Sequence, residues 1–352
     1  MDSATKSSGF NKLANQSNKR REIKVKKWFV IGLIMFSMGY LEGNPEAAEI
    51  GTNLEFGAGY RVDNLDWNIA GDITGNNPNI LSELTWSDVD IFQLKGGIRS
   101  TISEVFYLRG SLGYGWVFDG ENQDSDYSGD NRTLEWSRSN NSTDNGNVVD
   151  ATLGVGYQFK AAADRLKLIP LVGYSYSRQF FNITDGVQTV SEPGLAPPGS
   201  TPLPLGPFSG LNSTYESEWW GPWVGIDLLF DAGEKMTLFG GFEYHWANYN
   251  GEADWNLRSD FAHPKSFEHD ADGTGIIMSV GGEYHLSKPW YLSLNINYQD
   301  WSTDPGLDQL FFADGSTTET RLNEVNWDSF AILLGLTYRF QYNYPNKPGW
   351  MP

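Results

Sequence analysis

The chain contains segments in which large apolar residues alternate with small or polar ones. The clearest is FAILLGLTYRF, residues 330–340, in which every even-numbered residue is large and apolar or aromatic. Because the side chains of a β-strand alternate between its two faces, this segment predicts a strand with one unbroken apolar face. That face would pack on a core in a soluble sheet and contact lipid in a transmembrane barrel, so the recurrence of the pattern decides between them.

The alternation recurs in nine further segments. They cover residues 54–60, 92–98, 106–116, 149–159, 168–176, 224–230, 237–246, 276–285 and 292–299. A series of such segments of roughly ten residues is the sequence signature of an outer-membrane barrel. The pattern therefore predicts an all-β fold, a ten-stranded antiparallel transmembrane β-barrel.

The lengths of the intervening connections alternate as well. Those at 99–104, 160–165, 231–235 and 286–289 are short, whereas those at 61–80, 117–148, 177–218, 247–274 and 301–324 are long. Short periplasmic turns and long extracellular loops are typical of these barrels. A soluble secreted β-protein is the alternative, but it has no reason to place every long loop at one end.

The N-terminal region reads as an export signal. The longest apolar run, Trp28–Tyr40, is too short for a spanning helix and follows a basic stretch between Lys19 and Lys27. We expect residues 1–48 to form the signal peptide region, with cleavage near 39–48. Residues 49–340 would then form the barrel, and 341–352 a short C-terminal extension.

Composition places the exported part in a Gram-negative outer membrane. The chain has no Cys, 39 Gly, 14 Trp, 17 Tyr and 20 Phe, and a net charge of −19. Beyond residue 48 it carries 17 Lys and Arg against 40 Asp and Glu, which excludes nucleic acid as a partner. The expected partners are outer-membrane lipid, small solutes or cations if the barrel is a channel, and extracellular proteins that meet the acidic loops.

Several stretches resemble the omptins, outer-membrane proteases of enteric bacteria. They read SELTWSDVDIFQLKGGIR (82–99), LKLIPLVGYSYSRQFF (166–181), TYESEWWGPWVGIDLLF (214–230), FEYHW (242–246) and YRF (338–340). The resemblance implies an omptin-like barrel of ten strands that rises above the membrane. It also implies a cleft at the extracellular rim, where an Asp pair faces an Asp–His pair and activates water for peptide cleavage.

The Asp pair of omptins lies in an Asp-x-Asp-aromatic motif that follows a glycine. Here GENQDSDY matches it with Asp124 and Asp126, followed by Tyr127. Two carboxylates two residues apart on an extended segment share a face and can shift each other's pKa. The alternative is a chance match, because the region 119–150 is rich in acidic residues.

The Asp–His pair of the omptins has no counterpart at the expected spacing. The equivalent positions after Trp246 are Ala253 and Trp255. The nearest candidates are Asp254, Asp260 and His263, and a relocated His263 would complete an omptin-type site. An ordinary loop histidine is the favoured interpretation of His263, so the question of enzymatic activity stays open.

The inner face of the predicted barrel carries charges of both signs. The expected lumen-lining residues are Lys95, Arg99, Arg109, Asp150, Asp227, Glu243, His245, Glu283, His285 and Arg339. Two Glu-Tyr-His repeats contribute four of them, and structural ion pairs are favoured there over a metal site. No nucleophile motif, phosphate loop or Cys/His metal site is present, so we expect no cofactor and no metal.

A looser resemblance, in layout, acidity and aromatic content, is to the Protochlamydia-type outer-membrane proteins, a family discussed as porins. Together these features predict a small passive channel or a non-catalytic surface barrel of omptin-like fold. The alternative is an omptin-type endopeptidase that uses Asp124, Asp126 and a relocated His263.

Overall fold

The computed structural model describes residues 49–343, which form strands joined by turns and loops. The strands are β1 (Glu49–Ile69), β2 (Ser82–Ile102), β3 (Phe106–Gly129), β4 (Thr133–Ser142), β5 (Gly146–Tyr157), β6 (Phe159–Ala161), β7 (Leu166–Ser191), β8 (Gly206–Pro207), β9 (Ser213–Asp231), β10 (Met236–Asp254), β11 (Phe267–Ser287), β12 (Trp290–Thr303), β13 (Gly306–Phe311) and β14 (Thr317–Asn343). Within this part of the chain, no helix has the length and apolar character needed to cross a membrane.

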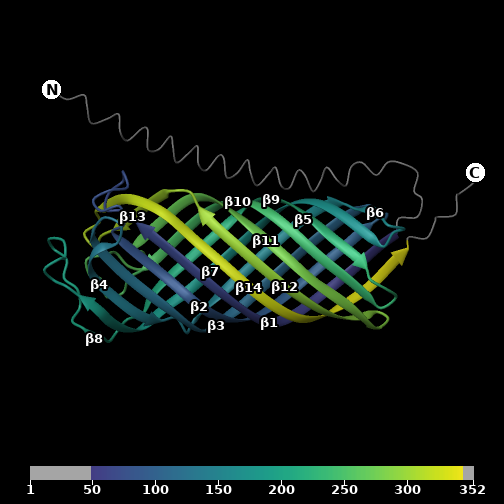
Figure 1. The fold of residues 1–352 in the computed structure, drawn as a ribbon, viewed down its shortest axis with the longest axis horizontal. Coiled ribbons are helices and arrows are strands. Elements are labelled where there is room, and N and C mark those ends of the chain that lie inside the picture. The colour runs from purple at the N-terminus through teal and green to yellow at the C-terminus, as the bar shows by residue number, and fades with distance from the viewer. Residues whose placement is uncertain (1–48, 344–352) are drawn as a thin grey trace, which may run out of the picture. The chain divides into compact units, whose positions relative to one another are not determined.

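The strands close into an antiparallel ring (Figure 1). Strand β1 pairs with β2 on one side and with β14 on the other, which joins the first strand to the last. Strands β4 and β5 share one place between β3 and β7, and β12 and β13 share one between β11 and β14. The described residues therefore form a ring of ten strand positions, which confirms the predicted fold class.

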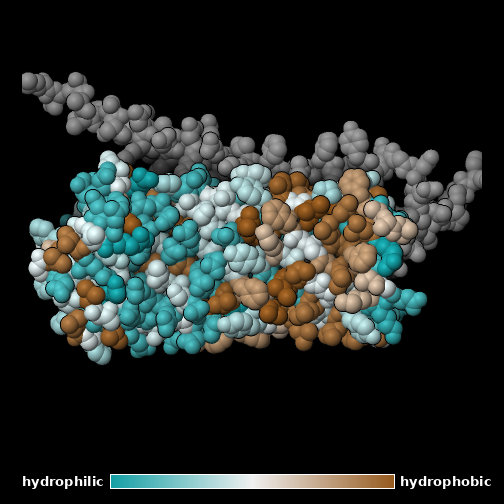
Figure 2. All heavy atoms as spheres, viewed as in Figure 1, coloured by the Kyte–Doolittle hydropathy of each residue, from teal (hydrophilic) through white to brown (hydrophobic). Residues whose placement is uncertain are grey.

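The outer surface divides the barrel into two halves. On β14, Leu334 is 58% exposed and Ile332 42%, whereas the intervening Leu333 is only 5% exposed. Exposed apolar residues of this kind gather toward the end that carries β6, and polar residues cover the end that carries β4, β8 and β13 (Figures 1 and 2). We call these the membrane half and the outer half. Because its long connections are extracellular by the rule for such barrels, the outer half faces the medium.

Most of the predicted long loops are strand in the outer half. Strand β1 continues to Ile69 and β7 to Ser191, so the connections that follow these two strands shorten to 70–81 and 192–212. Above the membrane the outward face no longer has to be apolar, so the alternation fades from the sequence. Backbone pairing continues regardless, because every strand still has a neighbour to satisfy its hydrogen bonds.

The interior changes character between the two halves. In the outer half it is an apolar core that includes Trp86, Trp219, Trp301, Trp327 and Tyr215, all at most 2% exposed. In the membrane half it holds ion pairs, described below. The two predicted segments at the ends of the chain, the signal peptide region 1–48 and most of the extension 341–352, lie outside the described residues; β14 itself runs to Asn343.

Candidate functional site

A cleft of about 460 Å³ opens in the outer half. Its walls come from β3, β4 and β13, from the start of β11, and from the connections 192–212 and 255–266. The lining is mainly apolar, with Trp136, Trp255 and Phe312 among its half-buried rings. Asp124 and Asp126 lie in this lining as its paired carboxyl groups.

A β-bulge places the two aspartates on the inner face. Up to Phe118, which is 53% exposed, the even-numbered residues of β3 face outward. The register between β2 and β3 then shifts around Asp90, and beyond the shift the even-numbered Asn122 is 2% exposed and lines the cleft. A bulge re-aims the side chains that follow it. Simple alternation would have put Asp124 and Asp126 outside.

Serine residues flank the aspartates across the strands. Asp126 lies opposite Ser82 on β2 and Ser137 on β4, and Asp124 lies opposite Ser139. The Oδ1 atom of Asp124 is buried and has no hydrogen-bond partner among the described residues. This burial makes a negative charge on Asp124 costly.

The pKa of each aspartate is raised. Burial raises the pKa of Asp124 well above its usual range, and the neighbouring charge of Asp126 adds to this effect. Burial also raises the pKa of Asp126 to about 6, against hydrogen bonds from Ser82 and Ser137 that lower it. Both carboxyl groups therefore bind a proton more tightly than free aspartates do.

Arg258 supplies the cationic group of the cleft. Its Nε and Nη2 donate to Asp260 at 2.9 and 2.8 Å, and its guanidinium lies 4.1 Å from the ring centroid of Phe261. The charge of Arg258 lowers the pKa of both aspartates, but less than burial raises them. Asp260, a candidate partner for His263 in the sequence, is thus paired with Arg258 instead.

His263 is paired, but away from the aspartates. Its Nδ1 lies 2.6 Å from Oδ1 of Asp254. On β10 the buried Gly251 and Ala253 face inward, so Asp254 faces outward, and neither Asp254 nor His263 lines the cleft. The structure therefore brings together two of the sequence candidates without bringing them to Asp124 and Asp126.

A second histidine, His269, lies beneath the cleft and had no signal in the sequence. It is fully buried, with Nδ1 at 3.0 Å from the Tyr215 hydroxyl and Nε2 at 3.3 Å from the Asp308 carboxylate. Thr320 donates to the other oxygen of Asp308 at 2.8 Å, and Trp67 packs edge-on against the imidazole at 4.8 Å. His269 is therefore a fully buried residue beneath the cleft, with a hydrogen bond at Nδ1 and none at Nε2.

All four histidines of the chain lie in the described residues, and none lines the cleft. The residues that do line it place the paired carboxyl groups, the carboxyl group of Asp308 and the guanidinium of Arg258 in an aromatic setting. Carboxyl pairs with separated pKa values can exchange protons with a bound ligand. The geometry thus allows hydrogen bonding and acid–base chemistry by carboxyl groups, without an imidazole.

Comparison with known families identifies the chain. The sequence model of the Protochlamydia outer membrane protein family matches residues 55–340. The chain belongs to this family. It is therefore an outer-membrane β-barrel protein located in the outer membrane, where lipid surrounds its apolar band.

One solved structure agrees with this assignment at the level of the fold. The outer membrane protease OmpT from Escherichia coli superposes with a TM-score of 0.68 at 14% identity, over 86% of this chain and 99% of OmpT. The translocator domain of the autotransporter NalP from Neisseria meningitidis gives a TM-score of 0.31 at 12% identity, over 93% of this chain and 98% of that domain. A comparison with curated protein sequences finds no match.

In this family member, the membrane half is crossed by ion pairs from the charged lumen residues. Arg109 donates to Asp227 and Glu243 at 2.7 Å each, and Arg99 is paired with Glu283 and Glu55. Three further contacts involve charged lumen residues. They are Arg339 with Glu283 at 2.8 Å, His245 with Glu243 at 3.0 Å, and Asp150 with Arg61 at 2.5 Å.

The two Glu-Tyr-His repeats therefore differ. In the first repeat, Nε2 of His245 lies 3.0 Å from Oε2 of Glu243. The Glu283 carboxylate is bound by arginines instead, and His285 packs on Tyr291 at 4.8 Å with an unpartnered Nε2. No cluster among the described residues gathers three ligands suited to a metal ion.

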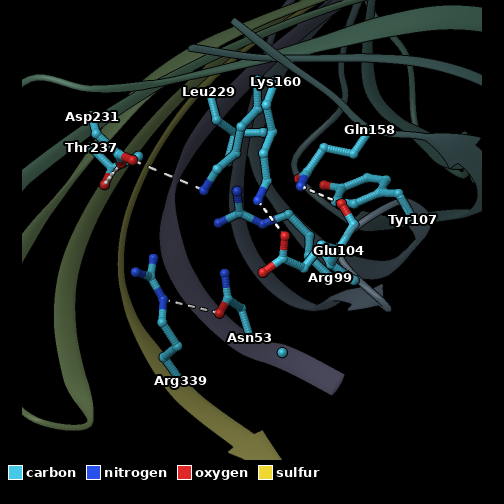
Figure 3. A pocket seen from close by; sticks show the side chains of 13 residues that line it. Asn53, Arg99, Glu104, Tyr107, Gln158, Lys160, Leu229, Asp231, Thr237 and Arg339 are labelled. Atoms are coloured by element: carbon cyan, nitrogen blue, oxygen red, sulfur yellow. Dashed lines mark hydrogen bonds and ion pairs between the residues drawn. The ribbon is translucent and has the colours of Figure 1, made fainter. Parts of the chain in front are cut away.

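A second cavity, of about 250 Å³, lies at the end of the membrane half (Figure 3). Charged side chains from several strands converge there. Lys160 is bound to Glu104 at 2.5 Å, and Lys167 lies 4.0 Å from Asp231. These contacts pair the two lysines of this mouth with acidic partners.

Proposed function

We propose that this protein is a closed surface barrel whose outer cleft binds a ligand from the medium. The supporting observation is the aromatic packing across the interior of the outer half. Trp86 on β2 stacks on Tyr215 of β9 at 5.0 Å, and Trp219 of β9 lies 6.2 Å from Trp327 of β14. These strands are not neighbours in the ring, so the contacts bridge the bore.

Ion pairs bridge the membrane half in the same way. Arg99 on β2 reaches Glu283 on β11, and Arg109 on β3 reaches Glu243 on β10, although the strands of each pair are separated in the ring. A barrel of about eight strands is already filled by its side chains, and this one fills its larger bore with Trp and Arg. Between the two expected roles, these contacts favour the surface barrel over the passive channel.

Single-channel recording tests the closed barrel. Purified, folded protein in a planar bilayer should give no conductance steps. The combined variant Trp219→Ala/Trp301→Ala/Arg99→Ala/Arg109→Ala, which removes rings and arginines from both bridges, should give steps, while Trp246→Ala on the lipid-facing surface should stay silent. Regular steps from the unaltered protein would contradict the proposal, and cation preference that fades with salt would then support the channel.

A second candidate function is peptide hydrolysis by the carboxyl pair. It is favoured by the two neighbouring carboxyl groups of Asp124 and Asp126, whose pKa values are both raised by burial, because such a pair can supply an acid and a base. Because His263 lies away from the cleft, such a reaction would proceed without it. Cleavage of a peptide substrate should then disappear in Asp126→Asn and persist in His263→Ala. Loss of cleavage in His263→Ala would restore the omptin-type mechanism.

A further inference from the structure

We infer that the cleft binds a neutral oligosaccharide that carries acetamido groups. This inference rests on the proposal that the cleft is a binding site, and it adds the chemical class of the ligand. Three observations carry it. The lining holds hydrogen-bond donors and acceptors without partners, its charged groups Arg258 and Asp308 already have partners, and the strands around it already pair on both sides.

Four buried polar atoms of the lining have no hydrogen-bond partner among the described residues. Two are indole donors, Nε1 of Trp67 and Nε1 of Trp136, and two are acceptors, Oδ1 of Asp124 and Oδ1 of Asn141. Trp67 is 2% exposed and Asn141 8%. More than nine in ten buried polar groups are normally satisfied, so four in one cavity indicate a ligand with donors and acceptors.

The orientation of Asn141 is held by its neighbours. Its Nδ2 donates to Asn122 Oδ1 at 2.8 Å and to Ser139 Oγ at 3.1 Å, and Asn122 in turn donates to the carbonyl of Thr85. These hydrogen bonds fix the Asn141 side chain and leave its carbonyl oxygen free to accept a hydrogen bond from a ligand. An acetamido group offers both a carbonyl for an indole N–H and an N–H for this carbonyl, and sugar hydroxyls can serve either kind of atom.

The charges of the cleft suit a neutral ligand. Arg258 is bound by Asp260 through two hydrogen bonds, and Asp308 is held by Thr320 and His269. Arg258 would repel a strongly basic ligand, and Asp126 would repel a strongly acidic one. A ligand without charge avoids both repulsions and still uses the four unpartnered atoms.

The strand pairing at the rim disfavours a peptide. Extended peptides often bind by adding a strand to an exposed sheet edge. Among residues 49–343, the strands that wall the cleft have neighbours on both sides: β3 lies between β2 and β4, and β13 between β11 and β14. The half-buried rings of Trp136, Trp255 and Phe312 instead offer apolar surfaces on which the faces of sugar rings can pack.

Calorimetric titration of the full chain with chitotriose tests the inference. The micelles must be of a detergent without a sugar headgroup, and heat-modifiable migration verifies folding of each variant. Chitotriose should bind about tenfold more tightly than maltotriose, which has no acetamido groups. Trp136→Phe keeps a ring but removes the donor, and should weaken chitotriose binding about tenfold. The lipid-facing control Trp246→Phe should change it by less than about twofold.

Three outcomes would overturn the inference. One is the absence of chitotriose binding at millimolar concentration, and another is binding that Trp136→Phe leaves unchanged. The third is cleft-dependent binding of an uncharged, end-blocked peptide in place of chitotriose. That last result would retain the binding cleft and reject its saccharide ligand, whereas failure of the closed barrel would be seen separately in the bilayer recordings.

Discussion

The membrane half and the outer half are built from the same strands with opposite polarity. On β14, Leu334 faces outward at 58% exposure while Thr337 faces inward and is fully buried. Nearer the N-terminal end of the same strand, in the outer half, Trp327 and Val325 face inward and are buried, and Glu324 is exposed outside. The backbone pairing is continuous, so the surroundings of the barrel, lipid or water, decide which face is apolar.

This inversion explains how the cleft is supported. Inside the membrane half, charges must be paired because the wall around them is apolar, and the pairs leave little freedom to move. In the outer half the interior is an aromatic core like that of a soluble protein, and it gives the cleft a rigid floor. The membrane half therefore holds the protein in the bilayer, and the outer half is a β-structure with an apolar interior and a polar surface.

The largest effect is expected in the aromatic core. Trp301 faces inward on β12 at 2% exposure and stacks on Trp327 at 5.5 Å. Trp301→Ala should lower the free energy of unfolding by about 3–5 kcal/mol, since it leaves a cavity. The neighbouring outward substitution Asp300→Ala should change it by less than about 0.5 kcal/mol. Denaturant unfolding in lipid vesicles measures both changes. Equal losses of unfolding free energy would contradict an inward-facing apolar core in the outer half.

The next effect concerns the outward face alone. Leu294 and Ser302 share one outward parity on β12 and differ in the half they occupy. Leu294→Arg should cost about 2–4 kcal/mol because it exposes a charge to lipid, whereas Ser302→Arg should be nearly neutral. The same unfolding measurement applies. A comparable cost at Ser302 would mean that the apolar band reaches further out than the exposed residues indicate.

The sequence predicted the membrane half well because lipid imposes a rule on every strand. A strand face in contact with hydrocarbon must be apolar, and this requirement produces the alternation of apolar and polar residues in segments such as 292–299 and 330–340. The outer half obeys no such rule, so residues 61–69 and 177–191 were predicted as loop although they are strand.

The site was predictable only in part. The resemblance to omptins located Asp124 and Asp126, but their inward orientation depends on the bulge near Asp90. His269 and Asp308 are far apart in the sequence and meet because β11 pairs with β13 in that register. The orientation of the aspartates and the contact between His269 and Asp308 both arise from how the strands pair, so the alternation of polarity does not predict them.

The carboxyl pair should make stability depend on pH within the outer half. Because the folded protein raises the pKa of Asp126 to about 6, it binds the proton more tightly than the unfolded chain. The free energy of unfolding should therefore fall as the pH rises from about 4 to above 6. Asp126→Asn should remove part of this slope and stabilise the protein by about 1–3 kcal/mol at pH 7. A slope unchanged by the substitution would contradict the raised pKa.

The smallest effect is expected at His263, on the outer face of the same half. Its pair with Asp254 is partly exposed to water, and exposed pairs contribute about 0–1 kcal/mol. His263→Ala should therefore leave the unfolding midpoint nearly unchanged and leave ligand binding by the cleft intact. The matched control is His269→Ala, which removes a fully buried ring that contacts Trp67 and leaves Asp308 with Thr320 alone. That variant should unfold markedly earlier, because it opens a cavity beside a buried carboxylate. If His263→Ala abolished binding or cleavage while His269→Ala did not, the working face of the outer half would be its outside and not the cleft.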